Sequence, residues 1–195
     1  MVNRIVQKAI DAGVITSSEQ DVYHYAYTLL FGKIGIFFLF GVMGAITGYF
    51  WESIVFLLTY TPLREYSGGP HVKSVGLCFV VSIVMFSVTL LPPLLVSSRQ
   101  LWWVVSLLLP IYSILIYVFA PQADPNKPMT IREKKHCGKM ARATLFVILG
   151  AIGLLWFLKV SYIWLYFLSA GIVLTGILVT IKAAQNHFRE QKYSN

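Results

Sequence analysis

Charged side chains are scarce in this 195-residue chain, where Asp, Glu, Lys and Arg make up 12% of the residues. Soluble domains carry roughly 25%, so a water-soluble globule of this size is not expected. Disorder is excluded too, because 57% of the residues are hydrophobic and 15% are aromatic. Two cysteines are too few for a disulfide scaffold. The mean hydropathy of +0.69 and the continuous apolar runs predict an all-α polytopic membrane protein.

Residues 1–22 lack the long apolar run and the small-residue cleavage site of a secretory signal. Their apolar side chains recur at nearly helical spacing and would share one helix face: Val2, Ile5, Val6, Ala9, Ile10 and Ala12. This pattern predicts an amphipathic helix that lies at the membrane surface or on a partner. A short soluble leader helix is the alternative.

About six membrane-spanning helices are predicted. Four segments have the roughly 20 mostly apolar residues that a crossing needs, and these are residues 72–91, 101–120, 141–158 and 161–181. The stretch 25–60 is too long for one comfortable crossing. We predict two helices in it, 26–46 and 48–62, with a turn near Thr47-Gly48. The second is short, and a tilted, kinked or re-entrant course stays open.

The basic residues predict the orientation. With six spans and both termini in the cytoplasm, fourteen of the 16 lysines and arginines lie on the cytoplasmic side, all but Arg99 and Lys159. The positive-inside rule describes this asymmetry. It also accounts for the net charge of +8, so nucleic acid is not expected as a partner. If residues 25–60 crossed only once, the N-terminus would lie outside instead.

The segment 121–140 is the only sizeable polar loop expected, within a single membrane domain that covers residues 1–195. Three prolines stiffen its start, and its basic half could continue as a helix into the next span. The basic residues Lys127, Lys134, Lys135 and Lys139 could serve only as an orientation signal. Alternatively they could form a docking surface for an anionic lipid or an acidic peptide.

His71 and Cys78 are the residues on which we expect chemistry. A cysteine in an apolar helix is usually an inert, small hydrophobic residue, but a histidine nearby can take its proton and pair with the thiolate. In one continuous helix the two would lie about 10.5 Å apart along the axis, at roughly 1.5 Å per residue. We therefore expect the helix to begin after His71, with Gly68-Gly69 folding the imidazole back and Ser74 as a cap.

Several other residues could support or compete with this pair. Arg64 could hold a peptide carboxylate or an oxyanion at Cys78, and Ser67 lies three residues after it. Glu52 lies in an apolar run, where a carboxylate is costly and usually paired, and Lys33 or Arg64 could be its partner. A zinc site is a weaker alternative, which would draw on these four residues: His71, Cys78, His136 and Cys137.

These residues resemble a known family. Arg64, Gly69, His71 and Cys78 resemble the signature of the accessory gene regulator protein B family (AgrB), which comprises quorum-sensing peptide-processing proteases of Gram-positive bacteria. The residues from Ala120 to Pro128 resemble the proline-rich loop of that family. The length, the six-helix layout and the basic cytoplasmic loop also match, so the resemblance covers nearly the whole chain.

The resemblance implies a membrane-embedded cysteine endopeptidase of the cytoplasmic membrane, without a cofactor or metal. Cys78 would be the nucleophile and His71 the base, and Arg64, Ser67, Gly68 and Gly69 would position the substrate or an oxyanion. The implied substrate is a small autoinducer precursor with an amphipathic helix and an acidic tail, which the loop lysines would bind. Cleavage through a thioester would lead to a cyclic thiolactone or lactone.

Two questions stay open at this point. One alternative from another class is a non-enzymatic small transporter or peptide-export partner, in which Cys78 only packs and His71 is interfacial. A homodimer is an alternative to the monomer. The sequence leaves the precursor, its cleavage position, the ring size and the roles of Glu52 and Cys137 undetermined.

Overall fold

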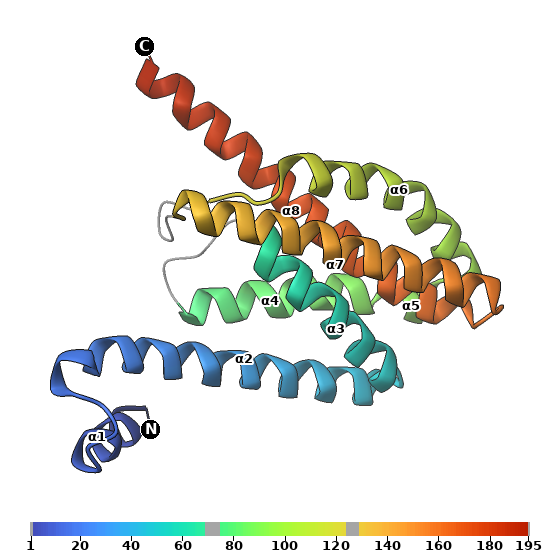
Figure 1. Cartoon of the computed structure of the whole chain (residues 1–195). Coiled ribbons are helices and arrows are strands. Elements are labelled where there is room, and N and C mark those ends of the chain that lie inside the picture. Colours follow the sequence, from blue (N-terminus) through green and yellow to red (C-terminus); the bar gives the residue numbers. More distant parts are fainter. Residues whose placement is uncertain (1, 69–74, 124–128, 195) are drawn as a thin grey trace.

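The computed structural model describes residues 2–68, 75–123 and 129–194, and nearly all of them lie in helices (Figure 1). In chain order these elements are α1 (Val2–Asp11), the short 3-10 helix η1 (Ser17–Glu19), α2 (Gln20–Thr47), α3 (Phe50–Ser67), α4 (Val75–Leu90), α5 (Pro92–Leu95), α6 (Ser98–Phe119), α7 (Ile131–Phe157) and α8 (Tyr162–Ser194). The described residues contain no strand, only an isolated bridge between Gly68 and Gln122.

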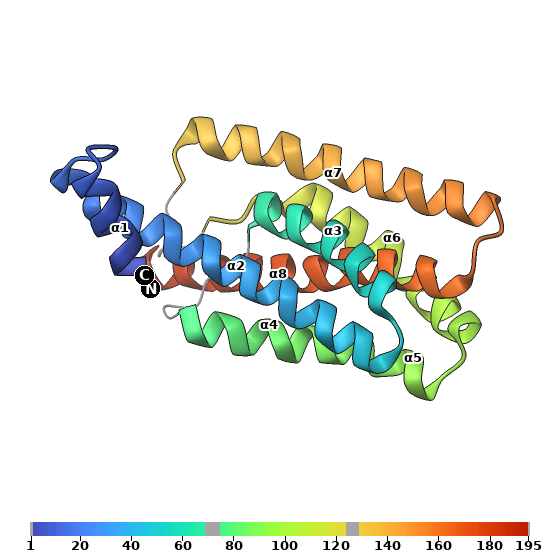
Figure 2. The same ribbon diagram turned by 90° about the horizontal axis from the view of Figure 1, so that it is seen from below.

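The predicted amphipathic helix near the N-terminus is present as α1. Its apolar positions Val2, Ile5 and Val6 are sheltered, whereas Arg4 and Lys8 are exposed. Helix α1 lies beside the start of α2 (Figure 2). The helix is therefore confirmed, and its place at a membrane surface stays a prediction.

Helices α2 and α3 meet where the sequence predicted a turn. α2 ends at Thr47, and Gly48 follows with a φ of 79°, in the left-handed region that favours glycine. The amide of Tyr49 donates to the Gly44 carbonyl across this end at 2.7 Å. The chain then reverses into α3, which is longer at its far end than the predicted 48–62.

The count of about six spans is only partly supported. Four described helices are long and apolar enough to cross a membrane, and these are α2, α6, α7 and α8. α3 has 18 residues but includes Glu52, Arg64 and Glu65, and α4 has 16 residues. The charged residues in α3 and the shortness of α4 keep both outside this group.

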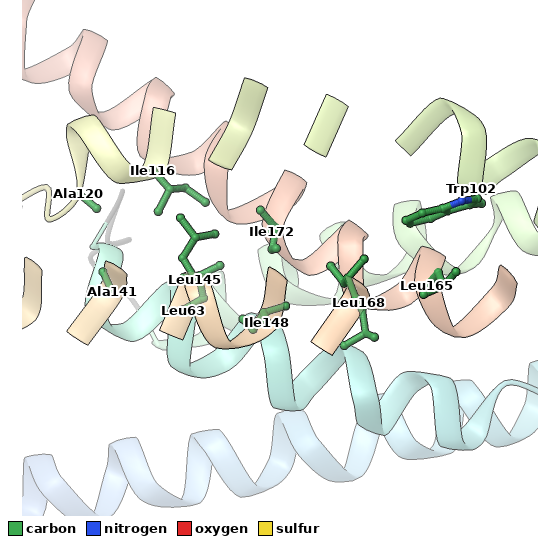
Figure 3. Packing of buried hydrophobic residues seen from close by; sticks show 11 residues of the cluster. Leu63, Trp102, Ile116, Ala120, Ala141, Leu145, Ile148, Leu165, Leu168 and Ile172 are labelled. Atoms are coloured by element: carbon green, nitrogen blue, oxygen red, sulfur yellow. The ribbon is translucent and has the colours of Figure 1, made fainter. Parts of the chain in front are cut away.

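Helix α8 is the central helix of the bundle. Of its most apolar window, 72% is buried, against 18% for α2, 28% for α6 and 22% for α7. One hydrophobic cluster joins it to α3, α6 and α7 through Leu63, Ile116, Leu145 and Ile172 (Figure 3). Another joins it to α2, α3 and α4, where the rings of Phe40 and Phe86 stack with their centroids 4.0 Å apart. α8 is thus packed on both sides.

The outer helices expose their apolar side chains. Phe38 on α2, Leu107 on α6 and Val147 on α7 are each at least 72% exposed. Such continuous apolar surfaces suit contact with lipid rather than water.

The helices from α2 onward run back and forth, so that several chain ends meet at one end of the bundle (Figures 1 and 2). The start of α2, the end of α3, the start of α4, the end of α6 and the start of α7 all lie there. The connections from α2 to α3, from α5 to α6 and from α7 to α8 lie at the opposite end. The segments predicted to face the cytoplasm therefore share one end, which we call the basic end.

Candidate functional site

The candidate site is built on the last turn of α3, at the basic end. α3 finishes at Ser67, and Gly68 follows with φ 73° and ψ −161°. This positive φ is strained for residues with a side chain, so glycine is required there. Gly68 is the last described residue before the segment 69–74, which contains Gly69 and His71.

Gly68 lies against a segment that is distant in the sequence. It pairs with Gln122 in a short parallel bridge, and the amide of Gln122 donates to the Ser67 carbonyl at 3.0 Å. A Cβ atom on Gly68 would clash with the Gln122 carbonyl oxygen and reach 3.0 Å from its amide nitrogen. The end of α3 and the proline-rich segment after α6 therefore form one unit.

Arg64 caps its own helix. Its Nη1 donates to the carbonyl oxygen of Gly68, just beyond the end of α3, and a cation there satisfies a helix-end carbonyl and opposes the helix dipole. Lys33, one of the two partners considered for Glu52, instead forms an ion pair with Glu65 at 3.1 Å. Glu52 lies in the first turn of α3, at the opposite end of that helix from Arg64.

Ser67 has a buried hydroxyl group at this point. The residue is 0% exposed, and its Oγ has no hydrogen-bond partner among the described residues. A buried hydroxyl without a partner costs free energy. Ser67 was predicted as a supporting residue, and that role stays a prediction.

Helix α8 holds the same segment from the other side. The Nδ2 of Asn186 donates to Oε1 of Gln122 at 3.0 Å and to the carbonyl of Ala123 at 3.1 Å. The Nε2 of Gln122 donates to the Phe119 carbonyl at 2.6 Å. Sequence reasoning assigned no role to Gln122 or Asn186, because the contact between them becomes visible only in the folded chain.

Lys182, also on α8, is a residue to which sequence reasoning gave only an orientation role. It precedes Asn186 by one helical turn and is 5% exposed, although lysine is rarely buried. The sequence offered one signal, a cation directly after the apolar run of the last span, but orientation explained it equally well.

The two predicted catalytic residues lie at the edge of what is described. His71 and Gly69 fall in the segment 69–74, outside the described residues, and so does Ser74, the predicted cap. Cys78 belongs to the first turn of α4, which begins at Val75, and its side chain is not described. α4 begins at the basic end, where α3 and α6 end (Figure 1).

The predicted loop 121–140 is helical from Ile131. Thr130 and Glu133 form a capping box, in which the Glu133 amide donates to Thr130 Oγ1 at 3.3 Å and the Thr130 amide donates to the Glu133 carboxylate at 2.8 Å. The basic half thus continues into the following span, as one of our alternatives expected. Three of the lysines proposed to bind the substrate tail are exposed on its first turns: Lys134, Lys135 and Lys139. Lys127 lies outside the described residues.

The zinc alternative gains no support. Over residues 2–68, 75–123 and 129–194, no three His, Cys, Asp or Glu side chains come together as a metal site. His136 is exposed, and Cys137 is a free, partly buried thiol on α7. The other two proposed ligands, His71 and Cys78, are not among the described side chains.

Comparison with known proteins agrees with the sequence signature. The family model for accessory gene regulator B matches residues 1–181. Accessory gene regulator protein B of Staphylococcus aureus (strain Newman) is 28% identical over 120 residues, which are 60% of this chain and 62% of the relative. Accessory gene regulator protein B of Staphylococcus intermedius is 33% identical over 53% of each chain. Putative AgrB-like protein 1 of Clostridium perfringens is 28% identical over 76% of this chain and 75% of the relative.

The matches span 62% of the Staphylococcus aureus relative and 53% of the Staphylococcus intermedius relative. No solved structure matches the chain. The family model, however, covers all the described helices except the last residues of α8, together with both signature segments. By that match, this chain belongs to the accessory gene regulator B family.

Proposed function

We propose that this chain is a membrane-embedded cysteine endopeptidase that processes a small autoinducer precursor peptide in quorum sensing. The match of the family model to residues 1–181 carries this proposal, because it includes the segment from Arg64 to Cys78. The similar staphylococcal proteins are named accessory gene regulator protein B. The arrangement at the basic end supports the proposal, since α3, α4 and the residues around Gln122 converge there.

In the proposed reaction, Cys78 attacks the carbonyl carbon of a peptide bond near the C-terminus of the precursor. His71 takes the thiol proton and passes it to the leaving amine, so that the C–N bond breaks and a C–S thioester forms. A thiol or hydroxyl of the precursor then gives its proton to His71 and attacks the thioester, which releases the Cys78 thiolate. The ring keeps its acyl bond because a site shielded from water favours this transfer over hydrolysis.

The remaining candidate residues have supporting roles in this proposal. Gly68, fixed on Gln122, sets the start of the segment that carries Gly69 and His71, and Arg64 stabilises that turn. The Ser67 hydroxyl is a donor available for a substrate carbonyl, because it is buried without a partner among the described residues. An acidic tail of the precursor binds the exposed lysines of α7.

Replacing the two residues of the catalytic pair tests the proposal. The protein is purified, reconstituted in liposomes and incubated with a candidate precursor encoded near its gene. Cys78→Ala and His71→Ala should abolish both cleavage and the covalent acyl-enzyme seen by mass spectrometry. Cys137→Ala is the matched control, because Cys137 is the other cysteine and carries no assigned role. Unchanged cleavage in Cys78→Ala protein would favour the non-enzymatic transporter or export partner.

The role of His71 as the base has its own measurement. The alkylation rate of Cys78, followed against pH in a Cys137→Ala background, gives the pKa of the thiol. If His71 activates Cys78, His71→Ala should raise that pKa, because the stabilising imidazolium is lost. Identical pKa values in both proteins would show that His71 does not activate Cys78, and that Glu65 or water acts as the base.

Replacing the exposed lysines of α7 tests whether they bind the substrate without taking part in the chemistry. Neutralising Lys134, Lys135 and Lys139 to Gln should raise KM for a precursor with an acidic tail and weaken its salt dependence, with kcat little changed. Arg99→Gln, at the opposite end of the bundle, is the control. If the lysines only orient the chain, correctly inserted triple-variant protein will keep the wild-type KM.

The same proposal includes six crossings with both termini and the catalytic segment in the cytoplasm of a Gram-positive bacterium. Single cysteines introduced at Ser98 and Val160, near the end of the bundle opposite the basic end, should react with an impermeant reagent added to intact cells. Cysteines at Lys127 and Lys192 should not react. Labelling of the Lys192→Cys variant from outside would overturn the six-span arrangement.

A further inference from the structure

Helices α6 and α7 leave an open groove between them on the outside of the bundle. The groove has a volume of about 470 Å³ and is lined by side chains that include Leu109, Ser113 and Tyr117 of α6 and Leu145, Phe146 and Leu149 of α7. That volume falls in the roughly 300–1,000 Å³ range of small-molecule sites. Both helices are long and apolar enough to cross a membrane, and such a crossing would place the groove beside the lipid chains.

A cation lies at one end of this groove, the end nearer the basic end of the bundle. The Nε of Arg142 donates to the carbonyl of Tyr117 at 3.3 Å. Its guanidinium lies 4.9 Å from the centre of the Tyr117 ring. Because Tyr117 also lines the groove, these contacts hold one exposed positive charge at the groove's mouth.

Two further cations extend this positive charge along α7. Lys139 and Lys135 precede Arg142 by three and seven residues, so the three side chains share one face of the helix. All three are exposed. The groove thus leads from an apolar interior to a positively charged rim.

The groove also has a polar group at a defined depth. Ser113 lies four residues before Tyr117 on α6, about 6 Å deeper along the helix axis. It lines the groove, is 9% exposed, and its Oγ has no hydrogen-bond partner among the described residues. In a phospholipid, the ester carbonyls lie deeper in the membrane than the phosphate, by a distance similar to that between Tyr117 and Ser113 along the helix.

We propose that this groove binds one acyl chain of an anionic membrane phospholipid, with the phosphate held by Arg142 at the groove's mouth. The Tyr117 ring packs against the start of the chain. An ester carbonyl accepts a hydrogen bond from the Ser113 hydroxyl, after that side chain turns toward the groove. This site is separate from the candidate catalytic pair, and it does not depend on the peptidase activity.

A lipid fits this groove better than a peptide tail. The lining of the groove is almost wholly apolar, and an acyl chain has no polar groups to satisfy. A peptide at the same depth would bury unpaired amides and carbonyls, each at a large cost. Basic pockets between membrane helices on the cytoplasmic side commonly take anionic headgroups.

Native mass spectrometry of the whole purified protein tests the proposal. The protein is equilibrated with equal amounts of phosphatidylglycerol and phosphatidylcholine that have identical chains. Wild-type protein should retain phosphatidylglycerol in preference. Arg142→Gln should reduce that preference about fivefold, the effect expected from one cation near a lipid headgroup. Arg132→Gln is the matched control, because Arg132 is an exposed cation of the same helix ten residues away.

Two substitutions at Ser113 distinguish the contribution of the open space in the groove from the contribution of the hydroxyl group. Ser113→Leu fills the groove and should abolish selective retention, whereas Ser113→Ala keeps the space and should cost only a few-fold. Thermal unfolding of each variant shows whether it is folded, and the Arg142 comparison stands if Ser113→Leu protein is not. Equal retention of both lipids by the wild type would overturn the proposal. So would displacement of phosphatidylglycerol by an acidic peptide, or equal effects of Arg142→Gln and Arg132→Gln.

Discussion

Helices α7 and α8 are both long and apolar, yet they are held in the bundle in different ways. Each carries two glycines within its apolar run. A Cβ atom on Gly171 of α8 would lie 2.7 Å from Thr59 Oγ1, and one on Gly176 would lie 2.6 Å from Tyr112 Cβ. Around Gly150 and Gly153 of α7, nothing lies within 4 Å of such an atom.

The difference shows how each helix is held in the bundle. Association of helices in lipid depends on close packing, since the hydrocarbon tails are as apolar as the side chains. α8 meets α3 and α6 at its glycines, where the backbones approach closely. α7 packs along one side only and leaves the groove toward α6. Its polar contacts at Thr130 and Arg142 lie in the first half of the helix.

Alanine at these four glycines should give the largest contrast. Gly171→Ala and Gly176→Ala introduce a methyl group where the neighbours are too close, and each should destabilise the protein by about 1–3 kcal/mol. Gly150→Ala and Gly153→Ala should be neutral or stabilise by up to about 1 kcal/mol, because alanine has the higher helix propensity. Thermal unfolding of purified protein in detergent measures both pairs.

This contrast also tests whether α8 is the centre of the fold. Equal losses from the α7 and α8 substitutions would show that the α7 glycines are packed as well, for instance by a second copy of the chain. Equal tolerance of all four would mean that α8 does not need close contact with α3 and α6.

The next largest effect is expected at Gly68, where a close contact serves the candidate site instead of the core. Gly68→Ala combines a strained positive φ with a clash against the Gln122 backbone, so peptide cleavage should fall at least tenfold. Gly48→Ala is the control, since Gly48 has a φ of +79° but nothing within 4 Å of its added Cβ. That substitution should cost about 1–2 kcal/mol of stability from the backbone alone and leave cleavage nearly unchanged. Equal cleavage by both variants would show that the close contact at Gly68 is not needed for activity.

Local signals in the sequence accounted for much of the fold. Gly48 marked the turn between α2 and α3, and the apolar spacing near the N-terminus marked α1. The early start of α7 was only an alternative, although the order Thr130, Ile131, Arg132, Glu133 is a capping-box signal. The length of α3 was underestimated, because Arg64 and Glu65 resemble the end of a span although both belong to the helix.

The long-range contacts of the candidate site could not be predicted in the same way. Gly68 and Gln122 are distant in the chain, and their contact depends on how α3, α6 and α8 pack. No local spacing encodes that packing. The same holds for Asn186, which lies beyond the last predicted span. The predicted pair of His71 and Cys78 stays a prediction.

Asn186 gives a smaller test of the same packing, because it connects the closely packed α8 to the site. Asn186→Ala removes the donor to Gln122 and Ala123, so we expect kcat to fall by a few-fold to tenfold with KM little changed. Gln185→Ala changes an exposed neighbour and should have no effect. A rise in KM alone, or an equal effect of Gln185→Ala, would show that Asn186 does not position the catalytic segment.

The smallest effect is expected in the turn before α2, far from the packed face of α8. The side-chain hydroxyl of Thr16 donates to the Glu19 carboxylate at 2.7 Å and its amide donates at 3.0 Å, and these bonds lower the pKa of Glu19 below the usual 4.5. A lowered pKa in the folded turn means that the Glu19 carboxylate stabilises the turn at neutral pH. This stabilisation is lost as the pH falls through the lowered pKa.

Amide hydrogen-exchange protection at residues 17–22 should therefore decrease on acidification in wild-type protein and stay flat in Glu19→Gln protein. Protection across α8 should not follow this titration, because Glu19 is fully exposed at the edge of the molecule. If α8 followed it, the N-terminal turn and the central helix would open together, and the two regions would not be independent.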